Sequence, residues 1–346
     1  MSVALDLGSS EFRSLRQEGE QLLARRIPAH YCVLPAAPPQ RRYLEQACIP
    51  YLLADQQYIV LGEHAADVSL VQNTPLVPVI THEGIPQDDP VGRQVCASLL
   101  GSLIPQRTSP YGRRLPCVTT LPADSAADSM TGAFFNRLLA LMGYEMVPIN
   151  SGFALVLSSL AEKGYSGLAI TFGAESVSCC LAHTGVPVWE ATFAGGARVA
   201  EEVMAETRKQ YLYDREGTRY LDLLTIARWS RSPAVCIDNP KGPDAELFSS
   251  LYREWLGETV EQIAMAMEQA SSSTCRGPLY VAIGGRPQRT GGFVPLFIET
   301  CKKHGISITR ENVIVSPADS LQVARGALIF ALLEEDRPVW QSAAAA

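Results

Sequence analysis

Short apolar segments that run into glycine or serine alternate along this chain with longer amphipathic segments. The first, SVALDLG at 2–8, predicts a strand that enters a turn, and 12–19 and 20–28 predict the next strands of a meander. Apolar residues recur at helical spacing in 86–104 and 128–143, which predicts two amphipathic helices. The other elements expected in the first half are a loop at 35–42, a strand and short helix at 58–68, and a buried strand at 115–123.

The same order of elements starts again near residue 150. Residues 165–185 predict a hairpin of two apolar strands around a turn of small residues. The other predicted elements are helices at 151–164, 197–213, 221–230, 244–269, 291–305 and 317–335, and strands at 277–285 and 313–316. This repeated order predicts the α/β fold class, with two related α/β domains that face each other.

Composition then narrows the class of protein. The 346 residues carry a net charge of −7 with both signs mixed along the chain, so we expect no nucleic-acid partner. The nine cysteines lack a CxxC spacing and the five histidines are scattered, which indicates reduced thiols and gives no support for a zinc site. No apolar run is long enough to span a bilayer, and no signal peptide precedes the first strand. We therefore expect a cytoplasmic protein.

Three turns that follow strands carry candidate chemistry: DLGSS at 6–10, TFGAES at 171–176 and IGGRPQRTGG at 283–292. A glycine at a tight turn lets backbone N–H groups approach an anion, and Ser9 and Ser10 add hydroxyl donors in the first turn. A glycine after a strand is a weak signal alone. Three such turns with matching flanking elements are far more specific, and they indicate a shared ligand site.

The residue types in these turns indicate the ligand. Asp6 can hold a hydrated magnesium ion through water, because Mg²⁺ dehydrates reluctantly. Gly284 and Gly285 would let the backbone lie against a flat ligand such as a nucleoside. The sequence has no GxxxxGK[ST], no GxGxxG that opens a helix after a strand, and no GxSxG. A P-loop NTPase, a dinucleotide-binding fold and a nucleophile elbow are therefore unsupported.

The order of these motifs resembles the actin superfamily, which includes the heat-shock chaperone ATPases and sugar kinases, and within it the bacterial actin MreB most of all. DLGSSEFRSL at 6–15 resembles the first phosphate loop, LAITFGAESVSCCLA at 168–182 the second, and YVAIGG at 280–285 the adenosine motif. Further segments that resemble the family lie at 58–104, 116–161, 194–204 and 318–333. The resemblance thus covers essentially the whole chain.

The resemblance implies an actin-like fold of two α/β domains, with ATP or ADP and Mg²⁺ in the cleft between them. Domain I would comprise 1–150 with about 328–346, and domain II 151–327. The positions implied to bind nucleotide are Gly8, Ser9, Ser10, Arg13, Gly173, Ala174, Glu175, Gly196, Gly284, Gly285 and Arg286. The positions implied to act in catalysis are Asp6, Ser151 and Thr171, with Asp6 also holding the metal through water.

Several positions depart from the family pattern. Thr171 stands where the second phosphate loop has Asp, and Ser151 stands where MreB has the Glu that orients the attacking water. Ala174 and Glu175 replace glycines, and their Cβ atoms restrict the approach of the backbone to phosphate. Arg13 falls where actin has a phosphate-contacting Lys, and both a phosphate contact and a plain surface role stay open.

These departures predict nucleotide binding with, at most, slow ATP hydrolysis, because hydrolysis depends on positioned water and neutralised charge. The leading hypothesis is a divergent MreB-like actin that self-associates into filaments or acts as a scaffold. The alternative is a monomeric adaptor of the same fold, like PilM or FtsA, at a membrane-associated partner on the inner face of the membrane. A small-molecule kinase is disfavoured by the chain length and by Thr171.

Overall fold

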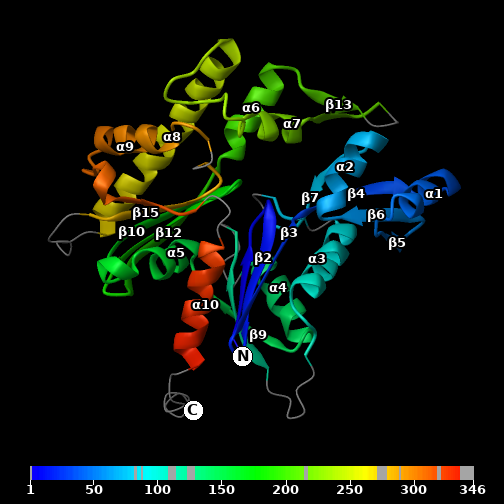
Figure 1. Cartoon of the computed structure of the whole chain (residues 1–346), viewed down its shortest axis with the longest axis horizontal. Helices are drawn as coiled ribbons and strands as arrows, with labels where there is room; N and C mark the ends of the chain where they lie inside the picture. The colour runs from blue at the N-terminus through cyan, green and yellow to red at the C-terminus, as the bar shows by residue number, and fades with distance from the viewer. Residues whose placement is uncertain are drawn as a thin grey trace.

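Two sheets with the same strand order form the frame of the molecule (Figure 1). The computed structural model describes residues 2–81, 84–86, 89–107, 114–122, 129–213, 217–270, 279–287, 290–317 and 321–335. The first sheet has the order β3-β2-β1-β8-β9, formed by Gln21–Pro28, Glu11–Glu18, Val3–Leu7, Leu115–Thr120 and Tyr144–Pro148. The second has the order β12-β11-β10-β15-β16, formed by Val186–Ala194, Ser176–His183, Gly167–Phe172, Val281–Gly285 and Val313–Val315.

Strand pairing repeats as well. In each sheet the first strand of the repeat, β1 or β10, pairs antiparallel with the next strand of its hairpin and parallel with a later strand. Every residue of β1 and β10 is buried. Both strands are apolar apart from one polar residue near the end, as expected for central strands that are covered on both faces.

Helices cover the outer face of each sheet. The first sheet packs against α3 (Pro90–Leu103) and α4 (Met130–Leu141) through an apolar core. α3 begins where the sequence predicts a capped helix, and the Asp89 carboxylate accepts a hydrogen bond from the Gly92 N–H at 2.7 Å. The second sheet packs against α6 (Arg198–Thr207), α7 (Leu223–Trp229), α8 (Pro243–Ala270) and α9 (Phe293–Lys303).

Two helices, α5 (Ser151–Ser159) and α10 (Gln322–Glu335), pack against each other between the two sheets (Figure 1). The α5 side chains join the core of the second sheet, and α10 contacts β1 and β8 of the first. Gly326 allows the close crossing, because a Cβ there would lie 1.7 Å from the Ala154 carbonyl oxygen. The two sheets are therefore joined through one tight helix contact.

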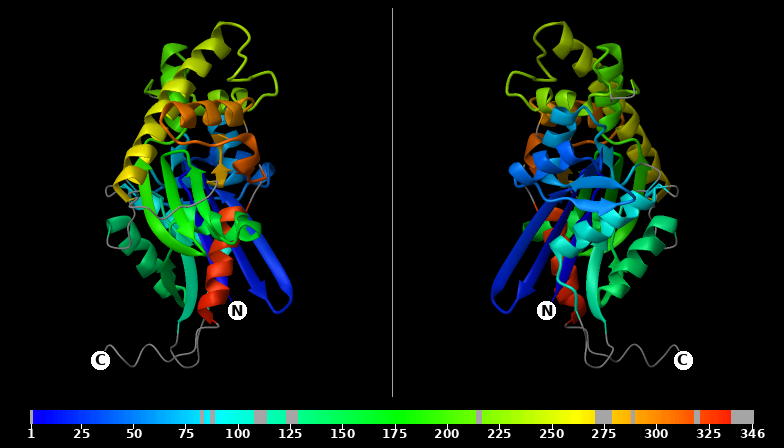
Figure 2. Two further views of the ribbon diagram at one scale, coloured as in Figure 1. Left: turned by 90° about the vertical axis from the view of Figure 1, so that its left-hand side faces the viewer. Right: turned by 90° about the vertical axis from the view of Figure 1, so that its right-hand side faces the viewer.

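Smaller units flank the opening between the sheets. A four-stranded sheet of the order β5-β6-β4-β7 carries α1 and α2, and these elements span Leu52–Ala54, Gln57–Leu61, His30–Pro35, Val77–Pro78, Pro38–Gln46 and Glu63–Gln72. On the opposite side β13 (Tyr211–Tyr213) pairs with β14 (Arg219–Leu221). Within the described residues, short 3₁₀ helices span Ala161–Lys163 and Arg310–Asn312. Figure 2 shows the β2–β3 hairpin reaching out past α10, with β3 mostly exposed.

The α/β fold class with two similar halves is confirmed, but two local predictions are wrong. The loop expected at 35–42 contains the start of α1, because Pro38 presets the first helical turn and Leu44 becomes buried against the small sheet. The helix expected at 197–213 ends at Thr207. Lys209 then has a positive φ of 54°, and the following residues pair with β14. The four-stranded sheet was predicted only in its strand at 58–61.

In the described part of the chain, no helix combines the length and the apolar composition needed to cross a bilayer. The cysteines at 32, 96, 117, 179, 180 and 301 are buried free thiols, Cys48 is exposed and Cys236 is half-buried. Cys275, the C-terminal alanine segment, residues 87–88 of the helix expected at 86–104 and residues 288–289 of the turn expected at 283–292 lie outside the described residues.

Candidate functional site

The three glycine-containing turns line one cavity of about 500 Å³ between the two sheets. The predicted site residues on its wall are Asp6, Gly8, Ser9, Ser10, Arg13, Ser151, Thr171, Gly173, Ala174, Gly284, Gly285 and Arg286. Glu175 and Gly196 do not line it. The repeat explains the convergence, because β1 and β10 are equivalent strands and each ends in a turn that points into the opening between the sheets.

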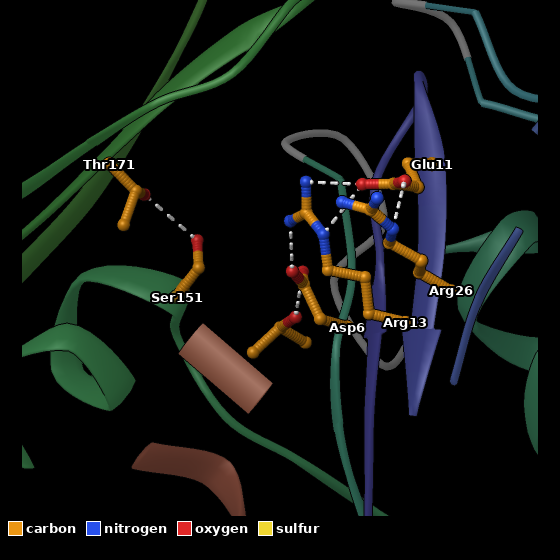
Figure 3. Close-up of polar contacts among 7 residues, drawn as sticks. Asp6, Glu11, Arg13, Arg26, Ser151 and Thr171 are labelled. Atoms are coloured by element: carbon orange, nitrogen blue, oxygen red, sulfur yellow. Dashed lines mark hydrogen bonds and ion pairs between the residues drawn. The ribbon is translucent and has the colours of Figure 1, made fainter. Parts of the chain in front are cut away.

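Asp6 is held in a polar network at the end of β1 (Figure 3). Cross-strand register places Arg13 opposite Asp6 in the hairpin, and its guanidinium lies 2.8 Å from Asp6 Oδ2. The other oxygen, Oδ1, accepts a hydrogen bond from the Thr120 hydroxyl at 2.8 Å. Glu11 also binds Arg13 at 2.8 Å. Burial lowers the pKa of Arg13, but Asp6 and Glu11 together raise it above its ordinary value. Arg13 is thus a fixed cation on the cavity wall.

Two hydroxyl groups meet on the opposite wall (Figure 3). Ser151 Oγ, at the start of α5, and Thr171 Oγ1, near the end of β10, lie 3.2 Å apart and share a hydrogen bond. The Thr171 hydroxyl also donates to the Ser178 carbonyl at 3.2 Å. Neither side chain can carry a negative charge, so this wall has neither a carboxylate ligand nor a general base at these positions.

The second turn is tied down by the start of α6. The N–H groups of Ala197 and Arg198 donate to the carbonyls of Gly173 and Ala174, at 3.1 and 2.9 Å. Glu175 forms an ion pair with Arg198, and both side chains are largely buried. The negative charge of Glu175 is therefore neutralised by Arg198 and does not face the cavity as a free carboxylate.

Gly196 supports this turn from outside the cavity. A Cβ at Gly196 would lie 2.3 Å from the Ala174 carbonyl carbon, so a side chain there would displace the turn. Glu175 and Gly196 thus shape the second turn. Both lie outside the cavity wall, and this position does not support the direct contact with a nucleotide that was predicted for them.

The third turn requires glycine because of neighbouring backbone. Gly285 has a φ of 104°, and a Cβ there would lie 2.1 Å from the Phe172 carbonyl oxygen. The N–H of Arg286 donates to the same oxygen at 3.1 Å. A Cβ at Gly284 would lie 3.1 Å from Leu155 Cδ2. The close approach in this turn is therefore to β10 and α5, and it keeps both glycines at the cavity wall.

Arg286 is anchored to a buried carboxylate on α6. Its Nη2 lies 2.9 Å from Glu201 Oε1, and the Glu201 side chain is only 4% exposed. Burial raises the pKa of Glu201, and the nearby guanidinium groups of Arg286, Arg231 and Arg198 oppose that rise. Breaking such a buried pair by removing one partner typically costs about 3–5 kcal/mol. The pair therefore fixes the third turn against α6.

Several buried polar atoms on this wall have no partner within the described structure. They are Ser10 Oγ, His30 Nε2, Arg286 Nε and Gln322 Oε1. Buried polar atoms in native proteins are usually hydrogen-bonded, and each exception calls for a water, an ion or a ligand. Their residues come from both halves of the chain and face one cavity, which indicates a polar ligand that touches both halves.

His30 is the most perturbed of these groups. Burial, with a contribution from the positive charge of Arg198, lowers the pKa of His30 to about 4. His30 is therefore neutral at pH 7 and can donate or accept one hydrogen bond to a ligand without adding charge.

Sequence reasoning missed Thr120, His30, Arg198, Glu201 and Gln322. Thr120 had a usable signal, because it ends a buried strand, and the ends of parallel strands meet at one edge of a sheet. Arg198, Glu201 and Gln322 lie in segments that resemble the family, but nothing in their pattern marked these positions, and only tertiary packing brings them and His30 to the cavity.

The residues around Asp6 do not fit a magnesium site. Both of its oxygens already accept hydrogen bonds, and one of the donors is a guanidinium. Among the residues that the structure describes, no group of three or more His, Cys, Asp or Glu side chains is placed to hold a metal ion. The prediction that Asp6 holds Mg²⁺ through water is therefore not supported by this donor set.

The sequence model of a protein family described as Volactin matches residues 1–331. The chain belongs to the Volactin family. No curated protein sequence matches it.

Solved structures of actin-like proteins match nearly the whole Volactin-family chain. The structure described as the MamK double helical filament matches at 13% identity with a TM-score of 0.69, and covers 98% of this chain and 100% of that one. MreB5 of Spiroplasma citri bound to AMPPNP matches at 11% identity with a TM-score of 0.63, and covers 96% of both chains. The ethanolamine utilization protein EutJ from Carboxydothermus hydrogenoformans matches at 11% identity with a TM-score of 0.52. The match covers 96% of this chain and 89% of the EutJ chain.

These likenesses show the fold. The chain has an actin-like fold, and the expected similarity to MreB is confirmed at the level of structure. At such low identity the details of the cavity are particular to this chain and are argued from its own residues.

Proposed function

We propose that this protein binds an adenine nucleotide in the cavity between its two sheets and self-associates as a divergent actin-like cytoskeletal or scaffold protein. The observation that carries the proposal is the convergence of all three turns, with four unpartnered buried polar atoms, on one cavity. Its volume of about 500 Å³ suits a small molecule, since such sites span about 300–1,000 Å³.

The cavity offers the kinds of contact that a nucleotide needs. Ser10 Oγ, from the first turn, and Arg286 Nε, from the third, are donors suited to phosphate or ribose oxygens. The glycines of the turns allow close approach of the backbone. Two related solved structures, MamK and MreB5, have AMPPNP bound, which supports the choice of nucleotide.

Weak or absent hydrolysis belongs to the same proposal. Thr171 and Ser151 occupy the positions at which the family pattern has carboxylates, and their hydroxyls bond to each other. A missing water-positioning or acid–base group typically costs about 10²–10⁴-fold in rate. We therefore propose a protein whose nucleotide acts as a structural or regulatory ligand.

Self-association is proposed from the likeness to MamK, which was solved as a double helical filament. In such filaments successive subunits make head-to-tail contacts that do not close into a ring. We further propose that each subunit has two domains, 1–150 with about 328–346 and 151–327, through which successive subunits contact each other. We also propose that the protein works in the cytoplasm.

Concentration-dependent light scattering and sedimentation with ADP, ATP or no nucleotide test this proposal, alongside calorimetry for binding. We expect binding of ADP and ATP at millimolar or lower concentration, and scattering that rises above a critical protein concentration. Absence of binding to either nucleotide would overturn the proposal.

The Ser151–Thr171 pair also favours a second candidate, a monomeric adaptor of the same fold at a membrane-associated partner. An adaptor keeps the nucleotide site and needs no turnover. Binding of nucleotide with flat scattering over the full concentration range would select this candidate over the filament.

A further inference from the structure

Resting on the proposed nucleotide site, we infer that arginine side chains, and not a divalent cation, supply the groups that hold the phosphates in this cavity. Nucleotide binding to this protein is then independent of Mg²⁺. The observation behind this inference is that the carboxylates of the cavity wall are already engaged, while arginines line the same wall.

Asp6 is the carboxylate that the sequence predicts to hold magnesium, and both of its oxygens already have partners in the protein. Arg13 binds Oδ2 at 2.8 Å and Thr120 binds Oδ1 at 2.8 Å. A hydrated dication at Asp6 would have to lie beside the Arg13 guanidinium or displace it. Both arrangements are unfavourable, because like charges repel and the Arg13–Asp6 pair is only partly exposed.

The other carboxylates on the described part of the wall are Glu11, Glu201 and Asp222. Glu11 binds Arg13 at 2.8 Å, and Glu201 is buried against Arg286 at 2.9 Å. Asp222 Oδ1 accepts the Thr225 N–H at 3.0 Å and caps α7. Mg²⁺ in nucleotide sites is usually held by one or two carboxylates together with the phosphates, and each of these three already has a partner in the protein.

The arginines of the wall offer N–H donors beyond those that bind these carboxylates, such as Arg286 Nε. Arg13, Arg198, Arg231 and Arg286 all line the cavity and come from both halves of the chain. A guanidinium presents several N–H donors in a plane and matches phosphate oxygens in pairs. Arg13 lies on the side of the cavity that the first turn forms. Its side chain is 27% exposed, so part of its donor set remains accessible to a ligand.

Calorimetric titration of the full-length protein with ADP and with ATP, in excess Mg²⁺ and in EDTA, tests the inference. We expect dissociation constants in EDTA that equal those in Mg²⁺ within about threefold. Constants at least about tenfold weaker in EDTA would overturn the inference and leave the proposed nucleotide site intact. Absence of binding under both conditions would instead overturn the proposed function, and this inference with it.

Variants at two facing positions identify the responsible cation. Arg13→Gln should weaken binding in EDTA by about tenfold or more. Added Mg²⁺ should recover part of that loss, because Asp6 is released to hold a hydrated ion. Arg26→Gln is the matched control, since Arg26 faces Arg13 across the hairpin. Its side chain is 59% exposed, and its Nε lies as far as 4.0 Å from Glu11 Oε1. It should bind as the wild type does.

Equal binding by Arg13→Gln and wild type in EDTA would overturn the role of Arg13. If Arg13→Gln fails to fold, as judged by circular dichroism, Arg13→Lys takes its place. That variant keeps the charge and should still bind nucleotide in EDTA, and a loss of EDTA binding restored by Mg²⁺ would contradict the inference. The comparison of wild type in Mg²⁺ and EDTA decides the main point without any variant.

Discussion

At the scale of single residues, the hydroxyl pair of Ser151 and Thr171 defines what this site can do. The two groups lie 3.2 Å apart on the cavity wall and hydrogen-bond to each other. Polar but uncharged, they hold a turn and a helix start together without attracting a cation. A structural contact therefore stands at the two positions where the resemblance implies catalytic groups.

Introducing carboxylates at these positions should create hydrolysis that depends on Mg²⁺. We expect the double change Thr171→Asp with Ser151→Glu to raise ATP turnover by about tenfold, equivalent to about 1.4 kcal/mol of barrier. The two effects should not add, because both act on one water and one metal. Phosphate release, measured with and without Mg²⁺, is the assay.

The gain should disappear when Asp6→Ala is added. A double variant that folds and binds nucleotide but hydrolyses no faster than the wild type would show that these positions do not correspond to the carboxylates of the family pattern.

His30 should make the protein lose stability in mild acid. Its pKa in the folded state is lowered to about 4, so the unfolded chain binds the proton first as the pH falls. The stability contributed by neutral His30 is complete above the ordinary histidine pKa of about 6.5 and is lost as the pH falls toward 4. The loss is at most about 3 kcal/mol by linkage.

Urea denaturation at pH 7 and pH 5 measures this effect. His30→Gln should flatten the dependence on pH, whatever its effect at pH 7. His183→Gln, at an exposed position at the end of β11, should keep the slope of the wild type. Equal slopes for wild type and His30→Gln would contradict the assignment.

At the scale of elements, the crossing of α5 and α10 is the joint between the two sheets. Gly326→Ala should lower the free energy of unfolding by about 1–3 kcal/mol, because its Cβ would lie 1.7 Å from the Ala154 carbonyl oxygen. Backbone cannot yield as a flexible side chain can, so the helices must move apart.

Gly101→Ala is the matched control on α3. Gly101 is exposed, and a Cβ there meets nothing within 4 Å. That change should raise stability by about 0.5–1 kcal/mol through helix propensity alone. Urea midpoints for both variants decide the point, and a neutral Gly326→Ala would show that the crossing is looser than the contact distance implies.

Element prediction succeeded where a periodic pattern coincided with burial. The strands that end in the three turns and the long amphipathic helices were expected from sequence and are present. It failed at α1 and β13, where proline-rich and tyrosine-rich segments take their structure from packing on a small sheet and from pairing with β14.

At the scale of the whole molecule, a ligand in the cavity should stabilise both halves together. ADP at about 100 times its dissociation constant should add about 2.7 kcal/mol to the free energy of unfolding. Three of the four tryptophans, at 189, 229 and 255, belong to the second half, and the fourth, Trp340, lies outside the described residues. Tryptophan fluorescence of a Trp340→Phe variant therefore reports on the second half, while far-ultraviolet circular dichroism reports on both.

With ADP present, the two signals should shift together to higher temperature and keep coincident transitions. A shift in fluorescence alone would show that the ligand contacts only the second half, contrary to a cavity shared by both sheets.

The sequence by itself determined the repeated strand–turn pattern, the α/β class and the residues of the three turns. Such features depend on local periodicity and on backbone freedom at glycine, which short segments carry on their own. Only the tertiary structure decided what surrounds those turns. Thr120 reaches Asp6 across 114 positions, and Glu201 meets Arg286 across 85. The polar network of the site depends on these long-range contacts, because packing alone sets which distant side chains meet.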